Sequence, residues 1–283
     1  MSTNAIEAVG LEKRYKGFTL GPISFTLPGG CVLGLIGANG AGKSTTIRLL
    51  LDMLRRDGGE VRIFGQDNRS DPRVLKEDIG VVFDDPGLPE ALTAKQMGKV
   101  FAGIYKRWDG AEYERLVKKL ALPQDKAFKE FSRGMRMKLA IAAALSHGAK
   151  LLLLDEPTGG LDPVVRDEVV TLFSEFTRDE NHAVLISSHI VSDLERLCDY
   201  VAFLHEGKLT LFEEKDRLLE EYGVLHCTAA ELAQLPAGAV AGKRESPYGV
   251  EAVVHRGAAP HSAALSPVTL EELFVLMAKK EAE

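Results

Sequence analysis

Short apolar runs recur along the chain, with stretches of helical periodicity between them. Five of these runs are nearly continuous instead of alternating: VLGLIG (32–37), IGVVF (79–83), LLLLD (151–155), AVLISS (183–188) and YVAFLHEG (200–207). Strands that are apolar on both faces are typical of a parallel sheet covered by helices on both sides. The pattern therefore predicts an α/β fold with a mostly parallel sheet.

Two other segments near the N-terminus have a different pattern. Residues 5–30 and the segment GGEVRIFGQ (58–66) alternate more regularly between apolar and polar positions and contain Gly and Pro turns. Alternation of this kind is typical of strands with one face on the core and one face in solvent. We expect an antiparallel β layer beside the parallel sheet.

The apolar strand pattern stops between Pro86 and Gly148, where amphipathic helix patterns replace it. MGKVFAGIYKRW (97–108) and YERLVKKLAL (113–122) are two of them. We therefore predict a helical insertion at about 86–148 in the α/β domain.

The sequence changes character again after EEKDRLLEEYG (213–223), an acidic stretch predicted to be helical. GVEAVVHR (249–256) is typical of a short strand, and PVTLEELFVLMAKK (267–280) of a helix with Pro and Thr near its start. We expect one domain over residues 1–222 and a small α+β appendage over 224–283. The appendage could mediate dimerisation, regulate the first domain or brace its core.

Composition narrows the classes of function. The chain has 283 residues, 45% of them hydrophobic, which is enough for a large globular core. A net charge of −6 leaves no basic footprint for nucleic acid, so no nucleic-acid partner is expected. Three widely spaced cysteines suit reduced thiols in a cytosolic protein. No uninterrupted apolar window is long enough to cross a bilayer, so any membrane role requires a partner.

A phosphate-binding motif follows the first predicted parallel strand. LIGANGAGKSTT (35–46) fits the pattern G-x-x-x-x-G-K-[ST] and opens a predicted helix. Its glycines let backbone N–H groups surround phosphates, its Lys supplies a cation, and its Ser offers a hydroxyl to Mg²⁺. The candidate nucleotide-binding residues here are Gly37, Asn39, Gly40, Gly42, Lys43, Ser44 and Thr45.

Two acidic residues follow the four-leucine strand in LLLLDEPTGGLD (151–162). Asp155 is suited to hold Mg²⁺ through water, and Glu156 is suited to orient and polarise the attacking water. Two consecutive carboxylates at a strand end cost free energy when they are unpaired. A purely structural interpretation explains the leucines but not this pair of acids. His189 ends the apolar run ISSHI and could hydrogen-bond a γ-phosphate at the same sheet edge, although a lone His is commonly structural.

The order of these motifs resembles that of the ATP-binding subunit of an ABC (ATP-binding cassette) transporter, over about residues 5–222. FSRGMRMKLAIAAALSHG (131–148), just before the LLLLD strand, resembles the signature of that family. Ser132 is placed to cap a helix whose N-terminal N–H groups could bind an anion. The resemblance implies that Ser132 and Gly134 contact the γ-phosphate held by a second subunit in a head-to-tail dimer.

The resemblance also implies further site residues. Tyr15 matches the aromatic residue on which adenine stacks, and Asp162 matches the loop that links the two sites across the dimer. His189 matches the switch histidine, which makes a catalytic role beside Lys43 and Glu156 the expected one.

The chain departs from the family motifs at two places. FSRGM replaces LSGGQ, so Arg133 stands for a glycine and Met135 for a glutamine. Arg133 could either bond phosphate or face solvent. In IGVVFDDPG (79–87), Asp84 matches a glutamine that reaches Mg²⁺ and the attacking water. Asp84 is therefore a candidate metal ligand with Ser44 and Asp155, whereas turn chemistry alone explains Asp85.

The function implied is ATP hydrolysis, with ATP and Mg²⁺ as cofactors, that drives transport through separate transmembrane permease subunits. A second ATPase subunit, identical or not, is the other expected partner, and the expected location is the inner face of the cell membrane. Export is favoured over import. Phe101, Tyr105 and Trp108 could line the permease-docking surface, or could belong to the core. Alternatives are an ABC ATPase acting on translation or DNA, and a module that senses nucleotide without hydrolysing it.

Overall fold

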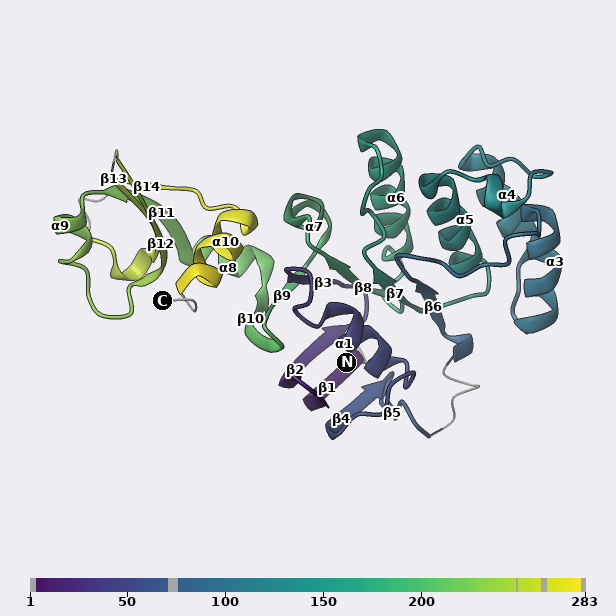
Figure 1. Ribbon diagram of the computed structural model, residues 1–283, viewed down its shortest axis with the longest axis horizontal. Helices are drawn as coiled ribbons and strands as arrows, with labels where there is room; N and C mark the ends of the chain where they lie inside the picture. The colour runs from purple at the N-terminus through teal and green to yellow at the C-terminus, as the bar shows by residue number, and fades with distance from the viewer. Residues whose placement is uncertain (1–3, 71–75, 248, 261–263, 281–283) are drawn as a thin grey trace.

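A six-stranded sheet with the order β10-β9-β3-β8-β7-β6 lies at the centre of the first domain (Figure 1). The structure is a computed structural model, and it describes residues 4–70, 76–247, 249–260 and 264–280. All neighbours in this sheet are parallel except β10, which is antiparallel to β9. The strands are β3 (Val32–Gly37), β6 (Ile79–Val82), β7 (Leu151–Asp155), β8 (Ala183–Ser188), β9 (Tyr200–His205) and β10 (Lys208–Glu214). The predicted α/β fold is confirmed.

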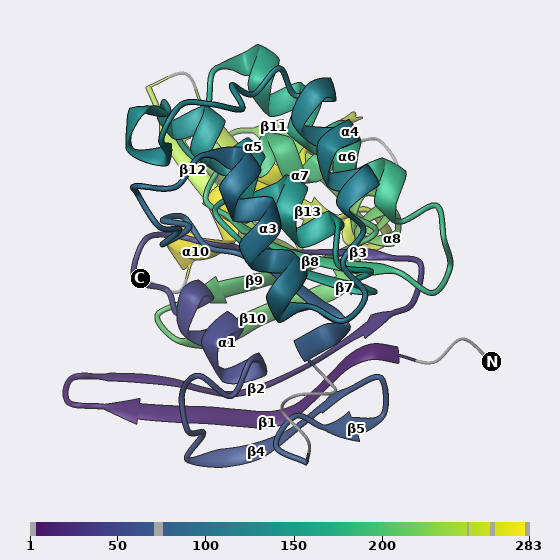
Figure 2. The same cartoon turned by 90° about the vertical axis from the view of Figure 1, so that its right-hand side faces the viewer.

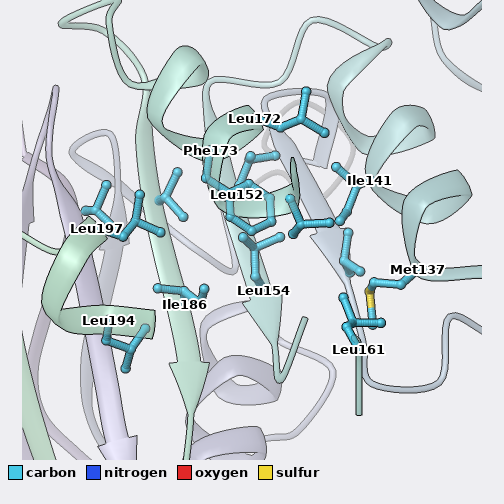
Figure 3. Packing of buried hydrophobic residues seen from close by; sticks show 14 of the residues in the cluster. Met137, Ile141, Leu152, Leu154, Leu161, Leu172, Phe173, Ile186, Leu194 and Leu197 are labelled. Atoms are coloured by element: carbon cyan, nitrogen blue, oxygen red, sulfur yellow. The ribbon is translucent and has the colours of Figure 1, made fainter. Parts of the chain in front are cut away.

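Four of the five continuous apolar runs form the middle of this sheet, as β9, β3, β8 and β7, and the fifth forms the edge strand β6. Every residue of β3, β7 and β8 is buried. On one face, Met137 and Ile141 lie near Leu152 and Leu154 of β7, as Figure 3 shows. Contacts on both faces explain why these strands carry no alternating polar positions.

A four-stranded antiparallel sheet lies beside the central sheet, as expected. Its order is β2-β1-β4-β5, with β1 (Asn4–Tyr15), β2 (Phe18–Pro28), β4 (Gly58–Ile63) and β5 (Gln66–Asp67). Its inward side chains share one hydrophobic cluster with β3 and with α1 (Lys43–Leu50), the helix between the two sheets (Figure 2). The phosphate loop therefore lies within reach of the β1–β2 hairpin.

Helices fill the chain between β6 and β7, and further helices connect the remaining parallel strands. They are α3 (Ala94–Ile104), α4 (Gly110–Lys119), a 3₁₀ turn (Phe128–Glu130), α5 (Arg133–Leu145), α6 (Pro163–Phe176) and α7 (Val191–Leu197). Thr93 and Gln96 form a capping box that starts α3. The prediction of a helix through residue 108 was wrong, because α3 ends at Ile104 and Asp109 then caps α4.

The aromatic residues in the last turn of α3 and just after it belong mainly to the core. Phe101 and Trp108 are partly buried against the main cluster, with ring centroids 5.4 Å apart. Tyr105 stacks on the buried His147, with ring centroids 4.2 Å apart. These contacts favour the core interpretation of the stripe over a docking surface.

The C-terminal part contains a third sheet, of order β12-β13-β11-β14. Its elements are α8 (Lys215–Glu221), β11 (Tyr222–Cys227), α9 (Ala229–Leu232), β12 (Val240–Ser246), β13 (Gly249–His255), a 3₁₀ turn (Arg256–Ala258), β14 (Leu265–Ser266) and α10 (Leu270–Lys280). Helix α10 contacts α7, and Leu273 and Leu276 share a hydrophobic cluster with Leu194 and Leu197. Of the three roles considered for the appendage, these contacts support bracing the core. Among the described residues, no helix is long and apolar enough to span a bilayer.

Candidate nucleotide site

Four parallel strands end at one edge of the central sheet and deliver polar residues there. The phosphate loop follows β3, Asp84 lies two residues beyond β6, Glu156 follows β7 and His189 follows β8. Parallel strands bring their carboxyl ends to the same edge, where open α/β sheets bind ligands. The fold therefore assembles residues that are far apart in the sequence.

The phosphate loop requires glycine for two reasons. Gly40 and Gly42 have φ values of 82° and 111°, in the left-handed region that side chains disfavour. A Cβ on Gly42 would also lie 2.7 Å from Leu20 Cδ1, and one on Gly37 2.7 Å from the Leu204 carbonyl oxygen. The loop leads directly into α1, which begins without a side-chain cap or an acidic residue in its first turn. Its first N–H groups are thus available to an anion.

Lys43 is buried at the start of α1, and its ammonium group faces the loop. Its Nζ donates to the Gly37 carbonyl oxygen at 2.7 Å and to the Ala38 carbonyl oxygen at 3.2 Å. It also forms an ion pair with Glu156, 3.0 Å from Oε1. The cation is therefore neutralised within the chain and positioned at the expected phosphate site.

Glu156 links the phosphate loop to β8. Its Oε2 lies 2.7 Å from His189 Nδ1 and accepts from the His189 backbone N–H at 3.3 Å. Its φ of 52° is unusual for a residue with a side chain, and such backbone conformations concentrate at functional sites. The structure thus brings together all three predicted catalytic residues, Lys43, Glu156 and His189.

Asp155 is buried and held by a residue that the sequence analysis missed. Ser187 Oγ donates to Asp155 Oδ1 at 2.7 Å and accepts from the Glu156 backbone N–H at 3.1 Å. The two residues are register partners in β7 and β8. A signal was present in the sequence, because Ser187 and Ser188 interrupt an otherwise apolar strand just before His189.

The donor set suits Mg²⁺ bound together with phosphates. Asp155 supplies a carboxylate, and the partly exposed Ser44 on the first turn of α1 supplies a hydroxyl. Within the described residues, no group of three His, Cys, Asp or Glu side chains gathers to form a self-sufficient metal site. A divalent ion here would need ligands from the nucleotide itself.

Tyr15 lies at the tip of the β1–β2 hairpin. It is 43% exposed, and its ring centroid is 6.4 Å from that of Phe18. The Phe18 ring in turn approaches Gly42, since a Cβ there would lie 3.4 Å from Phe18 Cζ. An exposed aromatic face is thus available beside the phosphate loop, as adenine stacking requires. Asn39 and Gly40 are exposed in the loop, and Thr45 is half-buried on α1.

The signature segment lines a separate cavity. Ser132 caps α5 by accepting from the Met135 N–H at 3.3 Å, as predicted. Asp162 caps α6 by accepting from the N–H groups of Val164 and Val165. A cavity of about 420 Å³ elsewhere lies between α3 and α4, whereas the one here is about 320 Å³. The smaller cavity is lined by Ser132, Arg133, Gly134, Met135, Lys138, Gly160, Leu161, Asp162 and Val165.

The two departures from the family motifs meet in space. Arg133 Nη2 donates to Asp84 Oδ1, and the two side chains form an ion pair. Neither alternative considered for Arg133, phosphate or solvent, included this partner. Asp85 accepts from the Gly87 N–H at 3.2 Å, which agrees with its interpretation as a turn residue. A metal-binding role for Asp84 stays a prediction.

Comparison with known proteins gives consistent matches. The family described as ABC transporter matches residues 20–159. The chain is 36% identical to the lantibiotic transport ATP-binding protein SrtF of Streptococcus pyogenes over 210 residues, 73% of this chain and 89% of that protein. It is 34% identical to the bacitracin transport ATP-binding protein BcrA of Enterococcus faecalis over 209 residues, 72% of this chain and 67% of that protein. A solved ATP-binding subunit of an ABC transporter superposes with a TM-score of 0.70 at 29% identity, covering 76% of this chain and 92% of that one.

Proposed function

This chain belongs to the ATP-binding subunits of ABC transporters, and on that premise we propose how its own residues bind and hydrolyse ATP. The chain is an ATPase that supplies a transporter with energy. The observation that carries the assignment of roles is the contact of Glu156 with both Lys43 and His189. The phosphate-binding lysine and the switch histidine thus both contact the carboxylate proposed to orient water.

In the proposed mechanism, Lys43 exchanges one anion for another. Its ammonium group leaves the Glu156 carboxylate for the β- and γ-phosphates, while the loop N–H groups and the start of α1 bind the same phosphates. The Glu156 carboxylate is then free to accept a hydrogen bond from the attacking water and orient it. His189 Nδ1 holds that carboxylate in position at the edge of the sheet.

Mg²⁺ would be held by Ser44 and, through water, by Asp155, and when bound it would neutralise developing charge on the phosphates. Ser187 fixes the Asp155 carboxylate for this role. Tyr15 would support the adenine ring by stacking.

The remaining residues point to a head-to-tail dimer. Ser132, Gly134 and Asp162 line a cavity of their own, so we assign them to ATP bound by a second subunit. Closure of the dimer on ATP and its reopening after hydrolysis would move separate permease subunits, with the ATPase at the cytoplasmic face of the membrane. Export is the direction we propose, since the chain resembles bacterial export-type cassettes and two relatives are named for transport of lantibiotics and bacitracin.

ATP turnover of wild type and Glu156→Gln tests the proposed roles. The variant keeps the size of the side chain and removes the carboxylate that orients water, so we expect turnover to fall by at least about a hundredfold. Glu175→Gln is a matched control, because Glu175 is exposed and forms an ion pair with Lys119 at 2.9 Å on the surface. Equal rates for wild type and Glu156→Gln would refute the assignment of Glu156.

A further inference from the structure

Asp84 and Arg133 form an ion pair although they are 49 residues apart in the chain. Asp84 follows β6, and Arg133 is the first residue of α5. Their side chains are 54% and 55% exposed, respectively. Both are charged residues at positions where the chain departs from the family motifs, so each unusual charge has the other as its partner.

Arg133 also contacts the loop after β7. A Cβ built on Gly160 would lie 3.4 Å from Arg133 Cζ, and one on Gly159 would lie 3.7 Å from Nη2. The guanidinium group therefore lies where three segments meet: the loop after β6, the start of α5 and the loop after β7. Any side chain at Gly160 would press against it.

The cavity beside Arg133 contains a second cation that is held more firmly. Lys138 lines the same cavity and has an 11% exposed side chain, and its Nζ is 2.5 Å from Glu168 Oε2. Arg133, in contrast, is held by a half-exposed carboxylate, and exposed ion pairs are weak. Arg133 is the cation that can change partners without leaving a buried charge behind.

We propose that Arg133 is a further ATP-binding residue, which Asp84 holds in place until nucleotide arrives. On dimer closure the guanidinium group leaves Asp84 and donates to the γ-phosphate of the ATP bound by the other subunit. This inference rests on the proposed head-to-tail dimer, in which the cavity lined by Ser132 and Gly134 faces that nucleotide.

The exchange follows from the chemistry of the two anions. The γ-phosphate carries more charge than one carboxylate and presents several oxygens to the planar fork of arginine. ADP lacks this group, so with ADP bound Arg133 stays on Asp84. The pair therefore makes closure more selective for ATP over ADP than a glycine at position 133 would.

ATP-dependent dimerisation of the full chain tests this directly. Measurements by light scattering in a Glu156→Gln background, where hydrolysis is slowed, give the ATP concentration for half-maximal dimer. Arg133→Gln should raise that concentration about tenfold, equivalent to about 1.4 kcal/mol, and leave ADP affinity unchanged. Arg115→Gln is the matched control, because Arg115 forms an exposed pair with Glu112 at 2.6 Å and does not line the cavity. It should change nothing.

Variants of Asp84 separate this proposal from a metal-binding role. Asp84→Asn should lower the ATP concentration for half-maximal dimer, since Arg133 no longer has a competing carboxylate, and should have no effect once Arg133 is Gln. If Asp84→Asn instead raises that concentration and the Mg²⁺ requirement, Asp84 acts on the metal and the proposal is overturned.

Exchanging the two charges, with Asp84→Arg and Arg133→Asp together, separates phosphate binding from a merely structural pair. The exchange restores the ion pair but places a carboxylate at the phosphate, so dimerisation should be weaker than with Arg133→Gln alone. Recovery of the parent's behaviour would overturn the proposal. If the Glu156→Gln parent binds ATP without dimerising, the proposed head-to-tail dimer is refuted. If this parent dimerises and Arg133→Gln behaves in the same way, only the role of Arg133 is refuted.

Discussion

Lys43→Met should destabilise the nucleotide-free chain, because it removes one member of a nearly buried ion pair. The side chains of Lys43 and Glu156 are only 6% and 14% exposed, so water screens their charges poorly. Breaking a buried pair from one side costs about 3–5 kcal/mol, because the remaining charge loses its partner. Glu156 keeps its contacts with His189. We therefore expect a loss near the lower end, about 3 kcal/mol.

Urea unfolding followed by circular dichroism measures this loss, and a double-mutant cycle isolates the pair. In Lys43→Met with Glu156→Gln, neither charge remains, so the double variant should be more stable than the sum of the single effects predicts, by about 2 kcal/mol. Lys119→Met is the control, since Lys119 and Glu175 are each 40% exposed. It should cost less than about 1 kcal/mol.

Additive effects in this cycle would refute the reasoning, because they would show that the two charges do not stabilise each other in the empty site. The same holds if Lys43→Met unfolds at the urea concentration of the wild type. The ion pair also opposes ATP binding, because the Lys43 ammonium group has to leave Glu156 before it can contact the phosphates.

Two further predictions concern the phosphate loop and acid stability. Gly42→Ala should lower the free energy of unfolding in urea by about 2 kcal/mol, because Gly42 has a φ of 111° and a Cβ there would approach Leu20. Gly40→Ala is the control and should cost less, because a Cβ on Gly40 has nothing within 4 Å. Equal costs would contradict the steric argument. Burial lowers the pKa of His147, so the unfolded chain takes up a proton at this residue more readily than the folded chain. The contribution of His147 to the free energy of unfolding is therefore fully present above about pH 6.5 and is lost as the pH falls below that value. His147→Phe keeps the stack on Tyr105 and should reduce the fall in melting temperature between pH 7 and pH 5.5, whereas an unchanged fall would place the effect elsewhere.

Much of the fold could be predicted because it depends on local pattern. Continuous apolar runs such as 151–155 require cover on both faces, which a parallel sheet with helices provides. The cap at Ser132 and the turn at Asp85 could also be predicted, because each is made by a hydrogen bond between residues at most three positions apart. The helix limit after Ile104 was not, since the aromatic residues beyond it continue the helical period while packing on other elements.

The sequence predicted candidate site residues but not the contacts between them. The motifs and the family resemblance gave Lys43, Glu156 and His189 as candidate catalytic residues, and strand order brings them to one edge. The spacing did not indicate that Lys43 pairs with Glu156, or that Ser187 holds Asp155. Ser187 meets Asp155 through the register between β7 and β8. Lys43 meets Glu156 because the start of α1 and the end of β7 lie at the same sheet edge, although β8 separates β3 from β7.

The sequence by itself determined the chemistry of this protein: a glycine-rich loop with a lysine, two carboxylates after a buried strand, and a serine that starts a helix. Each of these is recognised from a few consecutive residues, so the local order of the chain is sufficient to predict it. Only the tertiary structure decided how charges distant in the chain are paired, as with Asp84 and Arg133. A long side chain selects its partner by distance in space, and folding sets that distance by bringing β6, α5 and the loop after β7 together.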